Sequence, residues 1–386
     1  MSSMPVYLDH NSTTPLDARV LAAMLPYMQE LYGNASSQHR YGRLTSGAIE
    51  RAREQVAALV GAKPNQLIFT GGGTEANNMA LRSICAHNQT GHLAVSAIEH
   101  ASLREPAFAL CEEGWSVDEI PVSRDGVVDP AAVAAIMRTD TRMVSVMLAN
   151  NETGAVQPVE RIAAVVHTRN AVLHTDASQA VGKLPVDFAA LGADLMTISA
   201  HKFYGPQGIG ALVFNRSLNL QPLLRGGGHE RGLRAGTPNV AAIVGFGMAA
   251  ELAAAELAAR TQYLSRIRDR IQRALLQHPE VCIFAEKAMR LPNTLQFAVQ
   301  GYHGETLLLE LDRQGFAVSS GSACHSDAHE PSHVLLAMQI EPALALTAIR
   351  VSLGMSTKEQ DADKFVATLH GILTRFRQTS VRVANI

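Results

Sequence analysis

Short apolar runs recur between about residues 65 and 214 of the chain. They occupy residues 67–70, 93–98, 143–149, 172–177, 195–199 and 211–214. Helical patterns separate most of them: Asp129 and Pro130 form an N-cap and a first-turn proline, and Val159, Ile162 and Val166 mark one apolar face. Strands that alternate with helices predict a mostly parallel sheet with helices on both faces.

The pattern changes after Pro238. An Ala- and Leu-rich stretch, 240–276, contains only Gly245 and Gly247 as helix breakers and predicts one or two helices that lead into another domain. Beyond it the sequence predicts strands at 294–299 and 316–319 and helices at 305–314 and 357–378. This mixture is typical of a smaller α+β domain.

Composition and charge exclude some classes of function. The 386 residues are 47% apolar and 18% charged, as in an ordinary globular protein, and the net charge is −2. This balance gives no field for nucleic acid or an anionic membrane. The N-terminus lacks a basic segment followed by an apolar core, and we expect no apolar stretch to approach the roughly 20 residues that span a bilayer. We therefore expect a cytoplasmic protein without direct nucleic-acid or membrane partners.

Two polar residues at predicted strand ends indicate a cofactor. Lys202 follows the run 195–199, where desolvation would depress its pKa and make its amine a nucleophile able to form a Schiff base. Asp176 closes the preceding run, and an aspartate is the group that keeps a pyridinium nitrogen protonated. Because parallel strands end at one edge of a sheet, the pair suggests pyridoxal 5′-phosphate.

Other strand ends carry compatible groups. The glycines of 71–73 and Thr74 precede a helical pattern, so their amides could bind a phosphate, although a tight strand-to-helix turn is about as good an interpretation. The run is neither GxGxxG nor a Walker motif, which counts against a dinucleotide or nucleoside triphosphate. His100 could stack on a flat cofactor, and Asn150 and Asn151 close the next strand.

Taken together, these residues resemble the cysteine desulfurases of the NifS/IscS type, members of the class V aminotransferase family. The resemblance rests on residues 7–15, 33–39, 71–78, 99–100, 150–154, 174–179, 199–202, 226–230, 234–237, 319–324 and 349–354. It implies an α/β fold of the type I pyridoxal phosphate transferases (aspartate-aminotransferase-like). It also implies a large domain at 13–255 and a small domain, 1–12 with 256–386, that carries a catalytic-cysteine loop.

The resemblance assigns roles to individual residues. Lys202 would be the Schiff-base lysine, Asp176 the pyridinium partner, and His100 the stacking residue, with Gln179 hydrogen-bonded to the phenolic oxygen of the cofactor. The residues that would hold the phosphate are Gly73, Thr74, Ser199, His201 and, across a homodimer interface, Thr237. The residues that would bind the substrate carboxylate are Asn34, Asn151 and Arg350, whose guanidinium suits two oxygens.

Cys324 would decide the reaction. It lies in a small, polar stretch that predicts a mobile loop before a helix near Ser332, where a thiol can ionise and move. By contrast, Cys85 and Cys111 lie in apolar helical patterns and are expected in the core, and Cys282 is expected in a strand. The implied reaction removes sulfur from L-cysteine, leaving L-alanine and a persulfide on Cys324 for a sulfur-acceptor protein.

Alternatives stay open at this point. A selenocysteine lyase or cysteine sulfinate desulfinase needs the same cofactor groups, and a non-catalytic sulfur-transfer scaffold could keep the fold. The long segment between Cys324 and Arg350 resembles that of group I desulfurases, which favours transfer to a partner, but the acceptor leaves no readable motif. The loop histidines, His325, His329 and His333, are better interpreted as a solvated surface than as a metal site.

Some positions depart from the usual pattern of the family. They are His10, Ser12, Ala35, Tyr204 and Gln207. None of these departures removes a predicted catalytic group. They leave the side from which substrate enters less well defined than the cofactor site.

Overall fold

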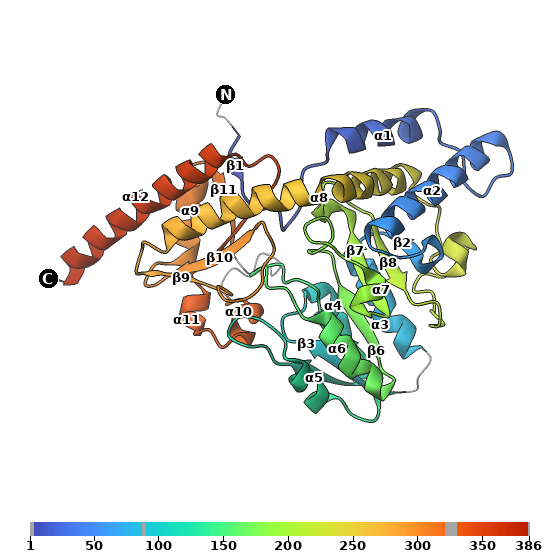
Figure 1. Ribbon diagram of the computed structural model, residues 1–386, viewed down its shortest axis with the longest axis horizontal. Coiled ribbons are helices and arrows are strands. Elements are labelled where there is room, and N and C mark those ends of the chain that lie inside the picture. Colours follow the sequence, from blue (N-terminus) through green and yellow to red (C-terminus); the bar gives the residue numbers. More distant parts are fainter. Residues whose placement is uncertain (1–3, 87–89, 321–329, 385–386) are drawn as a thin grey trace.

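The apolar runs between residues 65 and 214 form one seven-stranded sheet in the computed structural model (Figure 1). The structure describes residues 4–86, 90–320 and 330–384. The order across the sheet is β2 (Leu67–Thr70), β8 (Gly210–Phe214), β7 (Leu195–Ser199), β6 (Val172–Asp176), β5 (Thr141–Ser145), β3 (His92–Ser96) and β4 (Ser116–Ile120). All neighbours pair in parallel except β8, which is antiparallel to both β2 and β7. The predicted mostly parallel sheet is confirmed.

Side chains that alternate along the strands divide between two apolar clusters, one on each face of the sheet. In β2, Leu67 and Phe69 belong to one cluster and Ile68 to the other. One face is covered by α3 (Gly73–Cys85) and α4 (Ala101–Ala109). The other face is covered by α1 (Ala18–Gln29), α2 (Arg40–Leu59), α5 (Pro130–Ile136), α6 (Val159–Val166), α7 (Phe188–Leu191) and the first half of α8 (Val240–Leu275).

A second, smaller layer contains the rest of the chain. Its antiparallel sheet has the order β12 (Ser319–Ser320), β13 (Ala348–Ser352), β10 (Thr294–Val299) and β9 (Val281–Ile283). The helices α9 (Gly304–Arg313) and α12 (Glu359–Ala384) pack in the smaller core, whereas buried side chains of α10 (His333–Ala337) and α11 (Pro342–Ala345) join the core of the large sheet. The predicted strand at 316–319 is divided: β11 (Phe316–Ala317) pairs with β1 (Val6–Tyr7), whereas β12 joins β13. Leu8 therefore packs in the same core as residues 264–373.

The Ala- and Leu-rich stretch forms a single helix, α8, that runs through both cores (Figure 1). Its side chains as far as Ala253 join the core of the large sheet, and those from Leu264 join the smaller core. The predicted division at residue 255 falls between them. We expected no apolar stretch long enough to span a bilayer, and this expectation is wrong. By length and composition, part of α8 is apolar enough to cross a membrane, and half of that part is buried inside the structure.

Two further expectations fail for identifiable reasons. Strand β4 is not predicted by the sequence, because this edge strand has two exposed acidic residues, Asp118 and Glu119, and only Ile120 is buried, so it forms no apolar run. Cys111 is exposed rather than in the core, since α4 ends at Ala109 and a 3₁₀ turn follows. Cys85 is buried and Cys282 lies in β9, as predicted. The short 3₁₀ segments are Pro64–Gln66, Leu110–Glu113, His167–Arg169, Ala200–Lys202 and His229–Gly232.

The two glycines of α8 mark a close helix crossing. A Cβ at Gly247 would lie 2.7 Å from Cα and 2.8 Å from Cβ of Ala52 in α2, and a Cβ at Gly245 would contact Met24 of α1. Gly47 in α2, with nothing within 4 Å of its Cβ position, is a matched control. Gly245 and Gly247 therefore allow α8 to pack closely against α1 and α2.

We expect Gly247→Ala to lower the free energy of unfolding. Alanine gains about 1 kcal/mol of helix propensity, but overpacking against a backbone atom costs about 1–3 kcal/mol, so a net loss of up to about 2 kcal/mol should result. Gly47→Ala should instead raise stability by up to about 1 kcal/mol, because its position is open. Chemical denaturation of both variants measures this, and equal effects at the two positions would contradict the packing explanation.

Candidate active site

The carboxyl ends of the parallel strands border one cavity of about 330 Å³. The predicted residues that line it are Gly73, Thr74, His100, Asn151, Asp176, Gln179, Ser199, His201, Lys202 and Arg350. The lining residues that sequence reasoning did not assign are Asn11, Ser12, Ser102, Met147, Ala149 and Ser178. The topology of the chain thus brings residues of the large and the small core together around this cavity.

Lys202 reaches this cavity from the 3₁₀ turn that follows β7. Its Nζ donates hydrogen bonds of 2.8 Å to the carbonyl oxygens of Asn11 and Ser12. These acceptors belong to the N-terminal segment, which crosses the cavity wall. Two backbone oxygens therefore help to hold the lysine amine at the cavity.

Asp176 is the last residue of β6, and its side chain is held by two donors. Its Oδ1 accepts from the backbone N–H of Ser178 and its Oδ2 from Nδ2 of Asn77, both at 2.9 Å. Burial, followed by the nearby charge of Asp176, raises the pKa of Glu99 well above its usual value. The burial of Glu99 next to Asp176 therefore disfavours a second carboxylate charge at this place.

His100 is the N-cap of α4, which fixes its ring. Its Nδ1 accepts from the backbone N–H of Ser102 at 3.1 Å, so the proton of the neutral ring lies on Nε2. The hydroxyl of Ser102 lies 2.8 Å from the same Nδ1 and accepts from Nδ2 of Asn77 at 2.9 Å. Because Asn77 also donates to Asp176, the ring and the carboxylate are positioned by one shared amide.

The start of α3 is a cradle without side-chain atoms. Gly72 has a φ of 152°, which favours glycine, and a Cβ at Gly73 would lie 3.3 Å from Oγ of Ser178 and 3.6 Å from Cβ of Ser199. The buried Oγ of Ser178 has no hydrogen-bond partner among the described residues. A helix N-terminus beside an unpartnered hydroxyl is suited to a phosphate group.

His201 borders the same part of the cavity. Its Nδ1 lies 3.1 Å from Oγ1 of Thr13. Burial, with the charges of Lys202 and Lys183 adding to it, lowers the pKa of His201 to about 4. The ring is therefore neutral at pH 7 in this structure and can donate one hydrogen bond to an anion.

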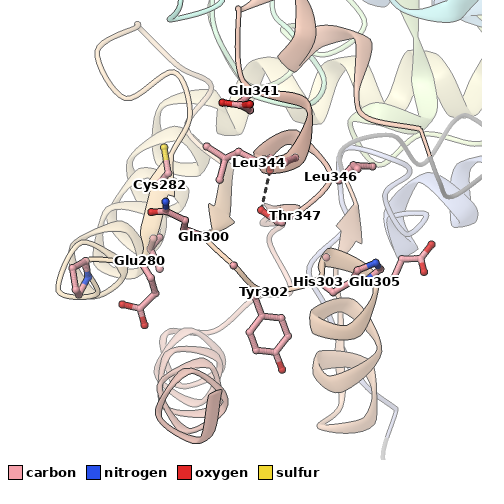
Figure 2. Close-up of a pocket in the computed structure, with 15 residues that line it drawn as sticks. Glu280, Cys282, Gln300, Tyr302, His303, Glu305, Glu341, Leu344, Leu346 and Thr347 are labelled. Atoms are coloured by element: carbon pink, nitrogen blue, oxygen red, sulfur yellow. Dashed lines mark hydrogen bonds between the residues drawn. The ribbon is translucent and has the colours of Figure 1, made fainter. Parts of the chain in front are cut away.

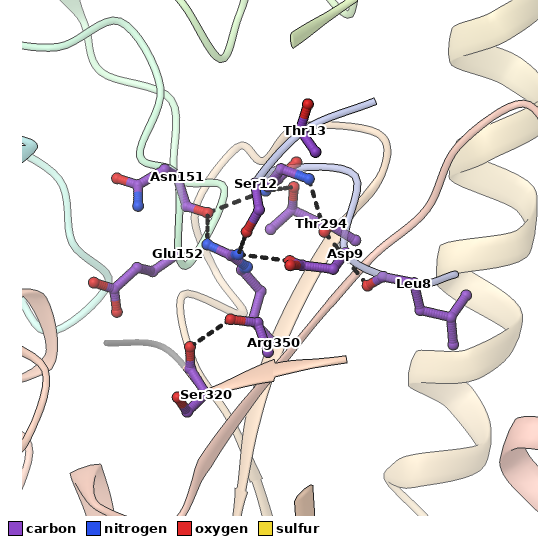
Figure 3. Close-up of polar contacts among 12 residues, drawn as sticks. Leu8, Asp9, Ser12, Thr13, Asn151, Glu152, Thr294, Ser320 and Arg350 are labelled. Atoms are coloured by element: carbon purple, nitrogen blue, oxygen red, sulfur yellow. Dashed lines mark hydrogen bonds and ion pairs between the residues drawn. The ribbon is translucent and has the colours of Figure 1, made fainter. Parts of the chain in front are cut away.

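Arg350 enters the cavity from β13 and is 3% exposed (Figure 3). Its guanidinium donates to Oδ1 of Asp9 and Oγ of Ser12, both at 2.7 Å, and to the carbonyl oxygen of Asn151 at 3.1 Å. Its buried Nε has no partner among the described residues. Ser12, one of the positions that depart from the family pattern, thus accepts a hydrogen bond from the guanidinium that would bind the substrate carboxylate.

Two of the predicted site residues lie away from the main cavity, and a third lies outside the described residues. Asn34 is exposed in the segment between α1 and α2, and Thr237 lines a separate small cavity with Gly71 and Arg234. Neither borders the main cavity of its own chain. Cys324 lies outside the described residues.

A larger cavity of about 770 Å³ lies in the smaller layer (Figure 2). Its lining includes Cys282, Glu280, Glu305 and Glu341 but no lysine or arginine. Burial, followed by Glu286, raises the pKa of Cys282, which keeps that thiol protonated. This cavity in the smaller layer offers an anionic cofactor no complementary charge. The cavity at the carboxyl ends of the parallel strands is therefore the better candidate active site.

Comparisons with known proteins agree with this geometry. The family model for aminotransferase class-V matches residues 6–365. The cysteine desulfurase IscS of Dictyoglomus turgidum is 42% identical over 378 residues, which cover 97% of this chain and 96% of that protein. A solved NifS-like protein superposes with a TM-score of 0.90 at 35% identity, covering 96% of this chain and 100% of that one. A structure described as SspA in complex with cysteine has a TM-score of 0.81 at 30% identity, with 90% and 98% covered.

These similarities extend over both cores and the residues around the cavity. The chain belongs to the aminotransferase class-V family, and within that family to the cysteine desulfurases. The resemblance predicted from the sequence is confirmed.

Glu152 connects the end of β5 to the smaller layer. Its Oε2 accepts from Oγ of Ser332, the N-cap of α10, at 2.6 Å and from Nε2 of Gln296 at 3.3 Å. Burial raises the pKa of Glu152 to about 7, against opposing effects of Ser332, Arg350 and Gln296. The folded protein therefore holds a proton here that the unfolded chain releases near pH 4.5.

We expect Glu152→Gln to reduce the pH dependence of stability. Between about pH 4.5 and 7 the folded state binds more protons than the unfolded state, so the stability of the wild type falls as pH rises, by about 3 kcal/mol from this residue. The variant, which keeps an acceptor for Ser332, should lack that slope. Urea denaturation at several pH values, with the exposed Glu112→Gln as control, measures it; parallel profiles would contradict the protonated Glu152.

Proposed function

We propose that the protein is a pyridoxal 5′-phosphate-dependent cysteine desulfurase that converts L-cysteine to L-alanine and carries the sulfur as a persulfide on Cys324. We propose further that it acts as a cytoplasmic homodimer and passes the sulfur to an acceptor protein. The observation that carries the proposal is that Lys202, Asp176 and Arg350 border one cavity. The free thiols of Cys85, Cys111 and Cys282 fit a reducing compartment.

The cavity fits the cofactor in both charge and shape. The phosphate would lie against the glycine cradle at the start of α3, with hydroxyls of Thr74 and Ser199 and the ring of His201 around it; the unpartnered Oγ of Ser178 supports this placement. Asp176 would keep the pyridine nitrogen protonated and Gln179 would donate to the phenolic oxygen. Lys202 would hold the cofactor covalently through Nζ. When bound, the cofactor supplies a conjugated ring that accepts electrons from bonds broken in the substrate.

The other residues of the cavity would bind the substrate and move its protons. Arg350 and Asn151 would bind the carboxylate of L-cysteine. The guanidinium of Arg350 could offer its unpartnered Nε and the N–H groups that donate to Ser12 and Asp9 in this structure. Lys202 Nζ, at the same cavity, would take the proton from the substrate Cα and return protons to carbon. Asn11 and Ser12 hold that nitrogen in place through their carbonyl oxygens.

The ends of the segment that contains Cys324 lie close to this cavity. At one end Ser319 pairs with Arg350 in the β12–β13 ladder, and at the other Ser332 donates to Glu152, next to Asn151. Three residues lie between Ser320 and Cys324, so the four Cα–Cα steps span at most about 14 Å. The thiolate would form an S–S bond to the substrate sulfur while the Cβ–S bond breaks, and the carbon would keep the electron pair and gain protons to give L-alanine.

A second copy of the chain would complete the site. Thr237 and Asn34 do not border the cavity of their own chain, but their segments meet where Oγ of Ser36 lies 3.3 Å from Nε2 of His229. Exposed apolar side chains gather on the neighbouring α1 and α2 region, namely Leu21, Leu25, Met28, Tyr32, Tyr41 and Leu44. Such a surface favours coverage by a partner subunit.

The cofactor assignment predicts a coloured protein. Wild-type protein supplied with pyridoxal 5′-phosphate should gain an absorbance band at the edge of the visible range, and borohydride should abolish the band and attach the cofactor covalently. Lys202→Ala should bind the cofactor without this attachment, which mass spectrometry measures. A wild-type protein that stays colourless would refute the proposal.

If Cys324 carries the persulfide, its replacement should reduce turnover without reducing cofactor binding. Cys324→Ala should keep the cofactor band but lose at least a hundredfold of L-cysteine turnover, because no thiolate receives the sulfur. Release of L-alanine and the mass gain of one sulfur on the wild type measure this, and Cys111→Ala, at an exposed thiol, is the control. Undiminished turnover in Cys324→Ala would favour a selenocysteine lyase or sulfinate desulfinase instead.

A further inference from the structure

A buried lysine that the proposed reaction does not use lies behind the cavity wall. Lys183 is 7% exposed, and its Nζ donates to Oε1 of Gln179 at 2.7 Å and to Oδ1 of Asn11 at 3.3 Å. Both acceptors are uncharged amides, and the charged groups that act on it, Lys202 and Arg350, have the same sign. Burial, followed by these two charges, lowers the pKa of Lys183 well below its usual value.

Such an amine is an expensive group to bury. It loses its hydration, gains no carboxylate partner from either acceptor and lies near two cations, whereas a methionine of similar length would fill the same space without these penalties. The position therefore contributes something other than stability. Its contacts indicate what that contribution is, because both lead to residues that line the cavity.

The shorter contact settles the orientation of the Gln179 amide. In the structure Nζ of Lys183 donates to Oε1 of Gln179, which leaves the amide nitrogen pointing the other way. Nε2 donates to the carbonyl oxygen of Asn11 at 2.9 Å, which agrees with this orientation. One N–H of Nε2 is then left to be presented on the cavity side.

We propose that Lys183 is a positioning residue that fixes the amide of Gln179 so that its nitrogen, and not its oxygen, faces the phenolic oxygen of the cofactor. The inference rests on the proposed function. An amide in the opposite orientation would place an acceptor against an acceptor, so Lys183 determines whether Gln179 attracts or repels the cofactor. Asn11, which contacts Lys183, Gln179 and Lys202, is held by the same arrangement.

Lys183→Met tests the proposal through binding rather than turnover. Removal of the buried amine avoids its desolvation cost but leaves Oε1 of Gln179 without this donor, so the two effects oppose each other and the free energy of unfolding of the cofactor-free variant should change little. Its affinity for pyridoxal 5′-phosphate, titrated by absorbance, should nevertheless fall about fivefold to tenfold, as one directed hydrogen bond becomes undirected. Lost stability together with lost affinity would indicate a merely structural residue and overturn the proposal.

A double-mutant cycle with Gln179→Ala makes the test specific. If Lys183 acts through Gln179, Lys183→Met should cause no further loss of cofactor affinity in the Gln179→Ala background, whereas additive losses would overturn the proposal. Thr261→Val is the matched control, because Oγ1 of Thr261 donates to the backbone oxygen of Lys183 at 3.0 Å. This control should lower stability and leave cofactor affinity unchanged.

The outcomes separate this inference from the proposed function. A wild type that does not bind pyridoxal 5′-phosphate refutes the function, whereas equal affinity of the wild type and Lys183→Met refutes only the positioning role. Lys183→Leu, also apolar, replaces the methionine variant if that variant does not fold. Failure of both to fold would mean that the amine is needed for the fold itself, and would overturn the proposal.

Discussion

The site depends on one short N-terminal segment that is held by hydrogen bonds from both cores. Asn11 donates through its side chain to Thr294 and to the carbonyl oxygen of Asn151, and its own carbonyl oxygen accepts from Lys202 and Gln179. Asp9 and Ser12 on either side accept from Arg350. The segment therefore fixes Lys202, which follows the large sheet, relative to Arg350 of the small sheet. Neither sheet could set that separation alone.

The main architecture was predictable because it depends on local patterns. Buried strands appear as apolar runs, and the parallel order brings Asp176 and Lys202 to one edge whatever the loops do. The missed features depend on partners far away in sequence. The sequence does not show that Asn11 and Gln179 accept hydrogen bonds from Lys183. Nor does it show that Ser178 lies next to Gly73. β4 lacks a local signal because it is an edge strand.

Two of the side chains with buried polar atoms that lack a partner among the described residues, Arg350 and Ser178, line the cavity. Among the described residues, the buried polar atoms without partners include Arg350 Nε, Ser178 Oγ and Glu99 Oε2. Leaving such atoms unpaired costs about 1–3 kcal/mol each. A bound anion or carboxylate recovers part of that cost, so the protein with cofactor and substrate should be more stable than the protein without them.

The continuity of α8 has a mechanical consequence. A helix of 36 residues is a rod about 54 Å long, and between Ala253 and Leu264 Arg260 is its one buried residue. The rod is thus buried at both ends and only partly covered in its middle. Because one unbroken helix belongs to both cores, neither core could change its orientation relative to the other without bending or displacing α8.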